Sequence, residues 1–370
     1  MKAWKKKGIA LAMAALAVTG FTGGCGSSER KAVAKLATRE ITDIKENKVM
    51  IPADVEKIAI TPIPWASITY ALDKSSERIA AIHPTAMSAY KGHLLEKLDT
   101  HFGTIDTKIV AQNFSVNTES MVSAGIEACI LWQYQEQDAE KLKKVGIAPV
   151  LIYNDTVDNL KKSFHIVGNL LGKKDQADKL CAYYDNAYNE ITKHKAEVEK
   201  ADKPTVLFIR NSKLRLQGND NFMHEALEIG GAYNPIEQSA LDSKNTEIPM
   251  EEIYKINPDV ILLSNFDTFV PDDLYENRIL GQDWSSVKAV QEKRVYKVPM
   301  GIYRWDAPGV ETPLMMKWIA HMLQPKIFGD IDIRNETKAF YKDMFNLDVT
   351  DADLALVFAD KVNEHSRPIY

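Results

Sequence analysis

The residues best suited to bind a ligand follow a series of predicted buried strands. The aromatic, arginine and amide side chains at these strand ends are Trp65, Trp132, Tyr134, Arg210, Asn211, Phe266, Tyr303, Arg304 and Trp305. Arginine forms charge-assisted hydrogen bonds with anionic groups, and aromatic faces stack on flat or cationic ones. In open α/β sheets, ligands bind beyond the carboxyl ends of the strands. The pattern therefore predicts a site for a bulky anionic ligand, held without covalent chemistry.

Several of these side chains also have a purely structural interpretation. Arg304, between Tyr303 and Trp305, could be a surface arginine in a turn, and Trp305 could pack beneath the following helix. Trp65 follows Pro64 at the end of a strand, which favours a position on the wall of the site. Both interpretations remain open from the sequence.

Motifs for catalysis or for direct metal binding are absent from the sequence. No histidine and cysteine cluster has metal-ligand spacing, and there is no phosphate-binding glycine loop, nucleophile elbow or HExxH motif. His83 follows a strand and could ligate a metal, although a capping or buried role is more common. Met223 and His224 could form a haem-ligating pair, but both are expected on a helix, and Asp306 and Glu311 lack the spacing of a hydrolytic pair. We expect no enzyme, no catalytic residue and no metal held by the protein.

Composition and charge fit a globular, two-domain protein that does not bind nucleic acid. The chain has 370 residues, of which 45% are hydrophobic and 26% charged. Met1–Gly24 contains four lysines and no acid, so the rest has 42 basic and 51 acidic residues and a net charge of −9. Such an acidic balance argues against a nucleic-acid partner. Three cysteines are too few for a disulfide framework, and we expect Cys129 and Cys181 to be buried.

The N-terminus has the features of a targeting signal. Four lysines precede an apolar run, residues 8–18, that is too short to span a bilayer. The small residues that follow end in Cys25 and resemble a bacterial lipoprotein signal, although Thr22 departs from the usual aliphatic residue. An ordinary secretory signal is the alternative. We expect a signal peptide over residues 1–24, a lipid on Cys25 as the anchor to the cell membrane, a flexible tether over 25–46, and an extracytoplasmic location.

An internal repeat flanks a predicted long helix at residues 175–200. Without gaps, residues 117–131 align with 249–263, so that Glu119 falls on Glu251 and Glu127 on Asp259. Each copy reads as a short amphipathic helix, a turn and a buried strand. The expected strands are 55–60, 78–82, 108–110, 129–132, 149–153, 205–209, 260–263 and 294–298.

Strands that alternate with helical patterns indicate parallel α/β sheets. We therefore expect an α/β fold of two Rossmann-like lobes joined by a single long α-helix, with a ligand cleft between the lobes. The predicted boundaries are 47–158 for the first lobe, 159–202 for the helical linker and 203–370 for the second lobe with its C-terminal helices.

These features together resemble one protein family. The lipoprotein-like leader, the Asn-x-Glu helix before a buried strand, the segment 250–261, the long central helix and the Arg-Val-Tyr…Pro…Trp tail resemble the helical-backbone substrate-binding proteins of ABC importers for iron-siderophore, haem and cobalamin. The resemblance covers roughly residues 50–325. It implies two lobes that move little, and a monomer that docks through one exposed glutamate per lobe, here Glu119 and Glu251, onto an ABC permease with its ATPase.

The expected function is therefore capture of an iron complex, most simply a ferric siderophore. Haem, a corrinoid or an oxyanion such as molybdate would suit the same architecture. A metal-cofactor enzyme with paired Rossmann-like lobes is the alternative from a different class, and it predicts cysteine or histidine ligands at the lobe interface. An adhesion or sensor lipoprotein is a third possibility.

Overall fold

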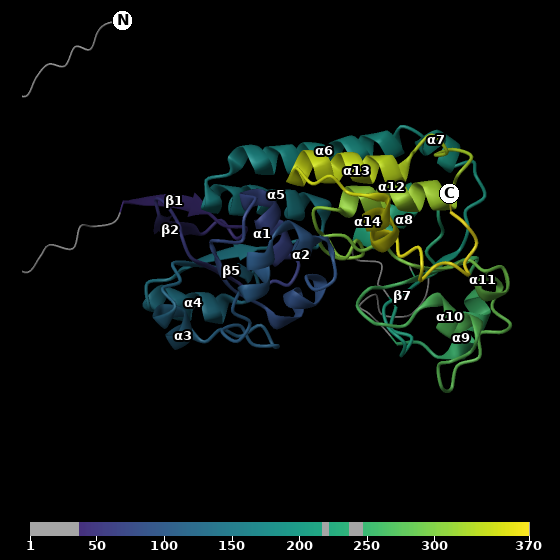
Figure 1. Ribbon diagram of the computed structural model, residues 1–370, viewed down its shortest axis with the longest axis horizontal. Coiled ribbons are helices and arrows are strands. Elements are labelled where there is room, and N and C mark those ends of the chain that lie inside the picture. The colour runs from purple at the N-terminus through teal and green to yellow at the C-terminus, as the bar shows by residue number, and fades with distance from the viewer. Residues whose placement is uncertain (1–36, 217–221, 237–246, 370) are drawn as a thin grey trace, which may run out of the picture. The chain divides into compact units, whose positions relative to one another are not determined.

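The computed structural model describes residues 37–216, 222–236 and 247–369 (Figure 1). The predicted signal peptide, the lipidation site Cys25 and much of the predicted tether lie outside these residues. Within the described ranges, no helix combines the length and the apolar character needed to cross a membrane. The helices and strands below all belong to the unit that begins at Ala37.

The first sheet has four parallel strands in the order β4-β3-β5-β6. Its strands are β3 (Ile58–Ile60), β4 (Ile79–Ile82), β5 (Ala128–Trp132) and β6 (Ala148–Ile152). Successive side chains point to opposite faces, so Ile130 packs in one hydrophobic cluster while Cys129 and Leu131 pack in another. Because both faces are covered, the strands are apolar along their whole length, as is usual in parallel sheets.

Helices cover both faces of this sheet. They are α1 (Trp65–Asp73), η1 (Pro84–Ala89), α2 (Leu94–Leu98), η2 (Thr100–Thr104), α3 (Thr118–Ser123), α4 (Glu136–Lys144) and α5 (Val157–Leu171). α1 and α5 pack in the cluster that contains Ile130, whereas Met121 of α3 and Leu142 of α4 pack in the opposite one. The sheet is thus the middle layer of three.

The second sheet has three parallel strands in the order β7-β8-β9. They are β7 (Val206–Ile209), β8 (Val260–Leu263) and β9 (Val295–Lys297). The helices of this half are α8 (Phe222–Ile229), α9 (Met250–Ile256), α10 (Pro271–Tyr275), α11 (Lys288–Gln291), α12 (Thr312–Leu323), α13 (Ile333–Phe345) and α14 (Asp351–Val357). Ile261 faces α9 and α10, while Leu262 faces the cluster that contains α8 and α12.

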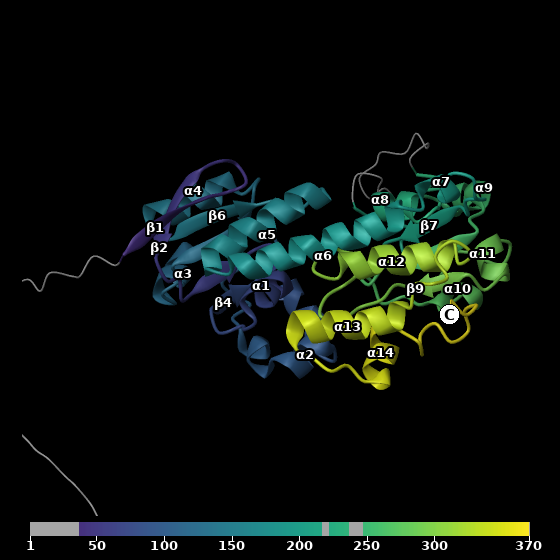
Figure 2. The same cartoon turned by 90° about the horizontal axis from the view of Figure 1, so that it is seen from above.

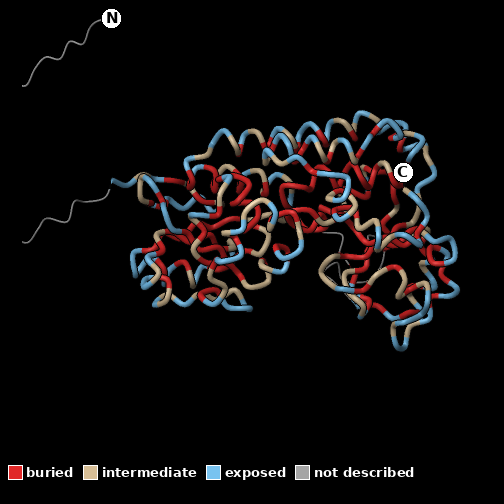
Figure 3. Tube along the Cα trace, in the orientation of Figure 1, coloured by how far each residue is buried: buried red, intermediate tan, exposed pale blue. Residues whose placement is uncertain are grey.

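A long helix, α6 (Lys174–Thr192), connects the two halves and is followed by the short α7 (Lys195–Val198). α6 packs against α5 along one part and against α12 along another, and Figures 1 and 2 show it beside both. Its buried residues follow the helical spacing predicted from the sequence, and its other face is exposed (Figure 3). The single helix predicted over residues 175–200 is corrected, because α6 ends at Thr192 and a separate short helix, α7, follows.

The internal repeat is confirmed by equivalent backbone contacts in the two halves. Glu127 accepts hydrogen bonds from the N–H groups just before β3, at Glu56 (2.6 Å) and Lys57 (3.2 Å). Asp259 accepts the equivalent bond just before β7, from Thr205 N–H (2.8 Å). The turns before these carboxylates also match. Gly125 and Asn257, each two residues before its carboxylate, both have a left-handed backbone conformation.

The predicted tether is corrected at its C-terminal end. Thr38–Thr42 forms β1, which pairs antiparallel with β2 (Lys48–Pro52). The strands alternate exposed and buried residues, with Ile41 and Val49 on the buried side. Ile44 N–H donates to Leu151 O (3.1 Å), which joins the hairpin to the edge of the first sheet.

The predicted strand at residues 108–110 is also corrected. The carboxylate of Asp106 accepts hydrogen bonds from the N–H groups of Lys108 (2.7 Å) and Ile109 (2.9 Å). This side-chain contact folds the backbone into a turn. Only an isolated bridge between Val110 and Val116 remains of the predicted strand.

Candidate functional site

Four predicted site residues converge at the carboxyl ends of the second sheet, and we call them the arginine cluster: Arg210, Phe266, Tyr303 and Arg304. They follow β7, β8 and β9 in turn. The guanidinium of Arg210 lies 3.9 Å from the ring centroid of Phe266, and that of Arg304 lies 4.9 Å from it. Arg304 is also 5.3 Å from the ring centroid of Tyr303. The structure thus brings four of the predicted residues together, and their role toward a ligand stays a prediction.

Arg304 also links the two sheets. Its Nε donates to Asn265 O (2.9 Å), its Nη1 to the Tyr303 hydroxyl (3.2 Å), and its Nη2 to the hydroxyl of Ser88 (2.9 Å). Ser88 lies on η1, at the carboxyl end of the first sheet. Arginine has five N–H donors, so two of them have no acceptor among the described residues. These two are the donors with which Arg304 could bind an anion.

A buried carboxylate lies beside the two guanidinium groups of the arginine cluster. Asp306 is 1% exposed, and its carboxylate accepts hydrogen bonds from the Ser264 hydroxyl and from Asn265 N–H (3.1 Å). Burial raises the pKa of Asp306, and burial lowers the pKa of Arg210 while Asp306 opposes that change. Among the described residues, two guanidinium groups thus lie near one carboxylate whose pKa is raised.

The loop that presents Phe266 is held by a lysine that the sequence analysis missed. Lys297 of β9 is 7% exposed and donates to the carbonyl oxygens of Ser264 (2.7 Å), Asp267 (2.7 Å) and Phe269 (3.0 Å). Burial lowers the pKa of Lys297 to about 8. Its only signal in the sequence is a charged residue inside an apolar strand.

At the first sheet, Trp132, the last residue of β5, forms a stacked pair with Tyr134. Their ring centroids are 6.2 Å apart with an interplanar angle of 20°, and Tyr134 is 65% exposed. Gln135 fixes the turn, since it accepts from the Thr61 hydroxyl (2.6 Å) and donates to Phe114 O (2.9 Å). The exposed ring of Tyr134 is therefore available to a ligand.

Asn211 has a structural contact in this state. Its carboxamide oxygen accepts hydrogen bonds from the N–H groups of Lys213 (3.1 Å) and Arg215 (3.1 Å), which closes the turn after β7. Asn211 thus shapes the loop next to Arg210, and its role toward a ligand stays a prediction.

The positions of Trp65 and Trp305 disagree with a ligand-binding role. Both side chains are 0% exposed. Trp65 is the first residue of α1 and packs toward Phe164 of α5, with ring centroids 5.9 Å apart. Trp305 packs against Phe358, with centroids 5.5 Å apart. Neither ring has a free face in this structure, so the core interpretation fits both better.

His83 caps a helix, which agrees with the more common of its two interpretations. Its Nδ1 accepts from Thr85 N–H (3.1 Å), and its Nε2 lies 3.2 Å from Gln112 O. A carbonyl only accepts, so Nε2 must donate and the imidazole is neutral. Burial also lowers the pKa of His83. In the described ranges, no group of three histidine, cysteine or acidic residues could hold a metal.

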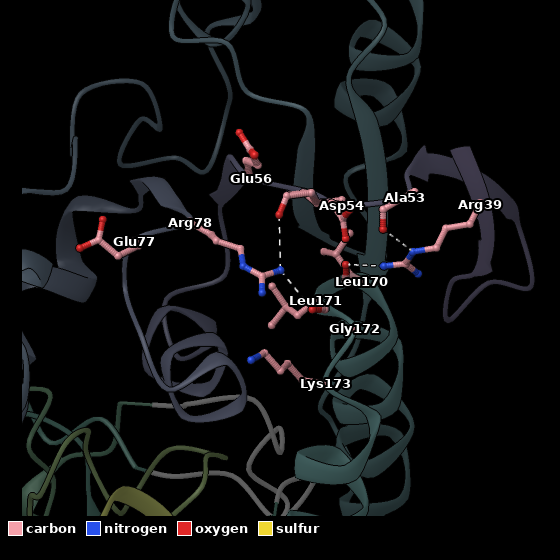
Figure 4. A pocket seen from close by; sticks show the side chains of 11 residues that line it. Arg39, Ala53, Asp54, Glu56, Glu77, Arg78, Leu170, Leu171, Gly172 and Lys173 are labelled. Atoms are coloured by element: carbon pink, nitrogen blue, oxygen red, sulfur yellow. Dashed lines mark hydrogen bonds between the residues drawn. The ribbon is translucent and has the colours of Figure 1, made fainter. Parts of the chain in front are cut away.

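A separate cavity of about 580 Å³ lies at the opposite ends of the strands (Figure 4). Glu56 and Arg78, which line it, come directly before β3 and β4. Arg39 donates to Leu170 O (2.9 Å) and Arg78 to Leu171 O (3.0 Å), at the C-terminus of α5. These arginines satisfy helix carbonyls, which is a structural role.

The two glutamates predicted to dock onto a permease are exposed and equivalent. Glu119 lies in the first turn of α3, and Glu251 lies in the first turn of α9. Three residues later on each helix is an exposed apolar side chain, Val122 (51% exposed) or Tyr254 (40% exposed). Residues three apart lie on the same helix face. Each half therefore presents an acid beside an apolar side chain.

Known proteins resemble this chain over most of its length. Residues 112–300 match the family model described as periplasmic binding protein. The crystal structure of a periplasmic solute binding protein from Veillonella parvula DSM 2008 superposes with a TM-score of 0.85 at 36% identity, and covers 90% of this chain and 100% of its own.

Two curated relatives are more distant in sequence. The molybdate-binding protein MolA of Haemophilus influenzae is 23% identical and covers 84% of this chain and 92% of its own. The Fe(3+)-citrate-binding protein YfmC of Bacillus subtilis is 23% identical and covers 80% of this chain and 90% of its own. Both are named as binding proteins, in agreement with the expectation that this chain is not an enzyme.

The family match and the shared two-lobed α/β fold lead to one conclusion. The chain belongs to the periplasmic binding proteins, which serve ABC importers outside the cytoplasm as their substrate-binding components.

Proposed function

We propose that this protein captures an anionic iron complex of the ferric-siderophore type and delivers it to its ABC permease. The arginine cluster carries this proposal. Arg210 and Arg304 lie 3.9 Å and 4.9 Å from the Phe266 ring centroid, and Asp306 is the buried carboxylate beside them. The two guanidinium groups disfavour a bare cation, whereas the oxygen atoms of an anionic chelate would accept hydrogen bonds from the two Arg304 donors that have no acceptor among the described residues.

The aromatic side chains favour a bulky complex over a small ion. Tyr134 is 65% exposed and stacks on Trp132, at the carboxyl end of β5 in the first sheet. Large aromatic faces contribute most when they cover apolar or planar ligand groups, which siderophores and other organic chelators carry. The similarity to a Fe(3+)-citrate-binding protein is consistent with such a ligand.

A small oxyanion is the second candidate. Arg304 has two N–H donors without acceptors among the described residues, and a tetrahedral oxyanion could accept both. The similarity to a molybdate-binding protein supports this alternative. A small oxyanion carries no flat or apolar group for the rings of Trp132 and Tyr134 to cover.

The delivery step in this proposal uses Glu119 and Glu251. Both are exposed at equivalent positions of the repeat, each beside an apolar side chain, and could pair with arginines of the permease. A lipid on Cys25 would hold the protein at the membrane where the permease lies. The first 36 residues fall outside the described part of the chain, so this anchor rests on the sequence alone.

A titration panel tests the ligand class. The soluble form that begins at Gly26 is titrated with ferric citrate, ferric hydroxamate and catecholate siderophores, haem, a corrinoid and molybdate, while tryptophan fluorescence is recorded. We expect saturable quenching by one iron complex, with an affinity that falls as salt is raised. Binding of molybdate alone would replace the iron assignment with the oxyanion, and binding of haem or corrinoid alone would also reject it.

A further inference from the structure

Tyr303 and Arg304 lie on a tight turn, residues 299–305, which we call the ligand turn. Gly301 N–H donates to Tyr303 O (2.9 Å), and Trp305 N–H donates to Pro299 O (3.2 Å). The whole ligand turn is less than 10% exposed apart from Met300. The direction of the Arg304 guanidinium therefore depends on whatever holds this turn in place.

A buried carboxylate accepts hydrogen bonds from the backbone of the ligand turn. Glu311, directly before α12, is 2% exposed and accepts hydrogen bonds from Ile302 N–H (2.8 Å) and Tyr303 N–H (3.0 Å). Burial raises the pKa of Glu311 to about 7, and its hydrogen bonds oppose that rise. A carboxylate accepts through both oxygens at once, so these two N–H groups favour its charged form against the larger effect of burial.

The third donor to this carboxylate comes from the C-terminal helices. The hydroxyl of Tyr341, on α13, donates to Glu311. A Cβ atom added at Gly301 would overlap both the Tyr341 hydroxyl and the Glu311 carboxylate. The turn, the carboxylate and the phenol are thus in close contact, and a shift of any one of them would move the others.

The C-terminal segment is itself fixed to helices of both halves. Phe345 of α13 stacks on Tyr70 of α1 at 6.3 Å, and Asp353 of α14 pairs with Lys97 of α2 at 2.7 Å. On the other side, Val357 O accepts a hydrogen bond from Met300 N–H of the ligand turn (2.9 Å). The position of Tyr341 therefore reflects the arrangement of both sheets.

We propose that Glu311 and Tyr341 are positioning residues for ligand binding, which hold the ligand turn so that Arg304 faces the anionic ligand. This inference rests on the proposed function. It assigns the C-terminal helices to the binding machinery, although they lie outside the strand ends that contact the ligand.

The test compares Tyr341→Phe with the wild type and with a matched control. The substitution keeps the ring packing and removes the one hydroxyl that contacts Glu311. We expect the Kd for ferric citrate, or for molybdate if that is the ligand bound, to rise about tenfold, the effect of one hydrogen bond to a charged group. Tyr183→Phe removes a hydroxyl from a ring packed on Phe340 of the same helix, and we expect its Kd to stay within about twofold of wild type.

Two further measurements separate positioning from a general loss of stability. Kd is measured at a temperature far below the thermal transition of each variant, where a purely structural role would leave affinity unchanged. In an Arg304→Ala background, Tyr341→Phe should raise Kd by less than about twofold, because both substitutions act through the same guanidinium. If Tyr341→Phe fails to fold, Glu311→Gln, which has the same shape and one acceptor fewer, takes its place with the same expectation.

The outcomes distinguish this inference from the proposed function. An unchanged Kd in folded Tyr341→Phe and Glu311→Gln, with binding lost in Arg304→Ala, would overturn the positioning role and leave the proposed function standing. If Tyr341→Phe also lowers the affinity tenfold in the Arg304→Ala background, the positioning role is overturned as well. A wild type that binds neither ferric citrate nor molybdate, nor any other anion of the panel, would overturn both.

Discussion

Replacing Arg304 with alanine should weaken ligand binding by about 100-fold. Three of its five N–H donors bind Asn265, Tyr303 and Ser88, and the proposal assigns to the ligand the two that have no acceptor in the described part of the chain. A hydrogen bond to a charged group contributes about 1.5–3 kcal/mol. Two such bonds at the lower end of this range contribute about 3 kcal/mol, which corresponds to a factor of roughly 100 in Kd. The substitution also removes one positive charge from the arginine cluster.

The assay is isothermal titration of the soluble form with the ligand that the panel identifies. Arg278→Ala is the matched control, because Arg278 is half exposed and pairs with Glu276 on the surface. Arg304→Lys keeps the charge but not the planar fork, and we expect an intermediate loss of about tenfold. Ser88→Ala removes one hydrogen-bond partner of Arg304 but leaves the charge of Arg304 in place. We therefore expect Kd to change by no more than a few-fold.

One result would refute the reasoning. If Arg304→Ala binds the ligand within about threefold of wild type while Arg278→Ala behaves the same way, the guanidinium makes no ligand contact. Arg304 would then serve only to bridge Ser88 and Asn265, and the anionic site would have to lie elsewhere.

Three further predictions concern delivery, packing and pH. Changing Glu119 and Glu251 together to alanine should reduce uptake of radioactive iron by cells at least tenfold while Kd stays unchanged, and normal uptake would reject the docking role. Gly301→Ala should lower the free energy of unfolding by about 1–3 kcal/mol in urea titrations, because the added methyl overlaps Tyr341 and Glu311, and a loss under about 0.5 kcal/mol would contradict that packing. Burial raises the pKa of Glu311 from 4.5 to about 7, so the folded state binds this proton more tightly than the unfolded state does. Relative to Glu311→Gln, wild type should therefore gain up to about 3 kcal/mol of stability as pH falls from about 8 to 5, and a pH-independent difference would argue against a titrating carboxylate.

The sequence predicted the two sheets well because their strands are buried on both faces. Residues 128–132 and 260–263 are continuous apolar runs, and the acid before each run, Glu127 or Asp259, caps the start of the neighbouring strand. A carboxylate in that place repeats because the same backbone N–H groups need an acceptor in both halves. The hairpin of β1 and β2 was missed because only one of its faces is buried and β1 is otherwise polar.

Strand ends were less predictable at the level of single side chains. Arg210, Phe266 and Arg304 meet as expected, but Trp65 and Trp305 turn into the core. Position after a strand fixes where the backbone lies, whereas the direction of the side chain depends on the next helix and on what packs there. Lys297 was missed because its three acceptors are carbonyls 28 to 33 residues away in the chain.

The most direct test of the central claim is to locate the metal in crystals grown with the iron complex that binds. Anomalous diffraction at the iron edge gives the metal position independently of the organic ligand. We predict one strong peak beside the guanidinium groups of Arg210 and Arg304, with ligand oxygen atoms within hydrogen-bond distance of Arg304 Nη1 or Nη2. A peak in the cavity lined by Arg39 and Arg78, or a metal bound directly by protein side chains away from the arginine cluster, would contradict the claim.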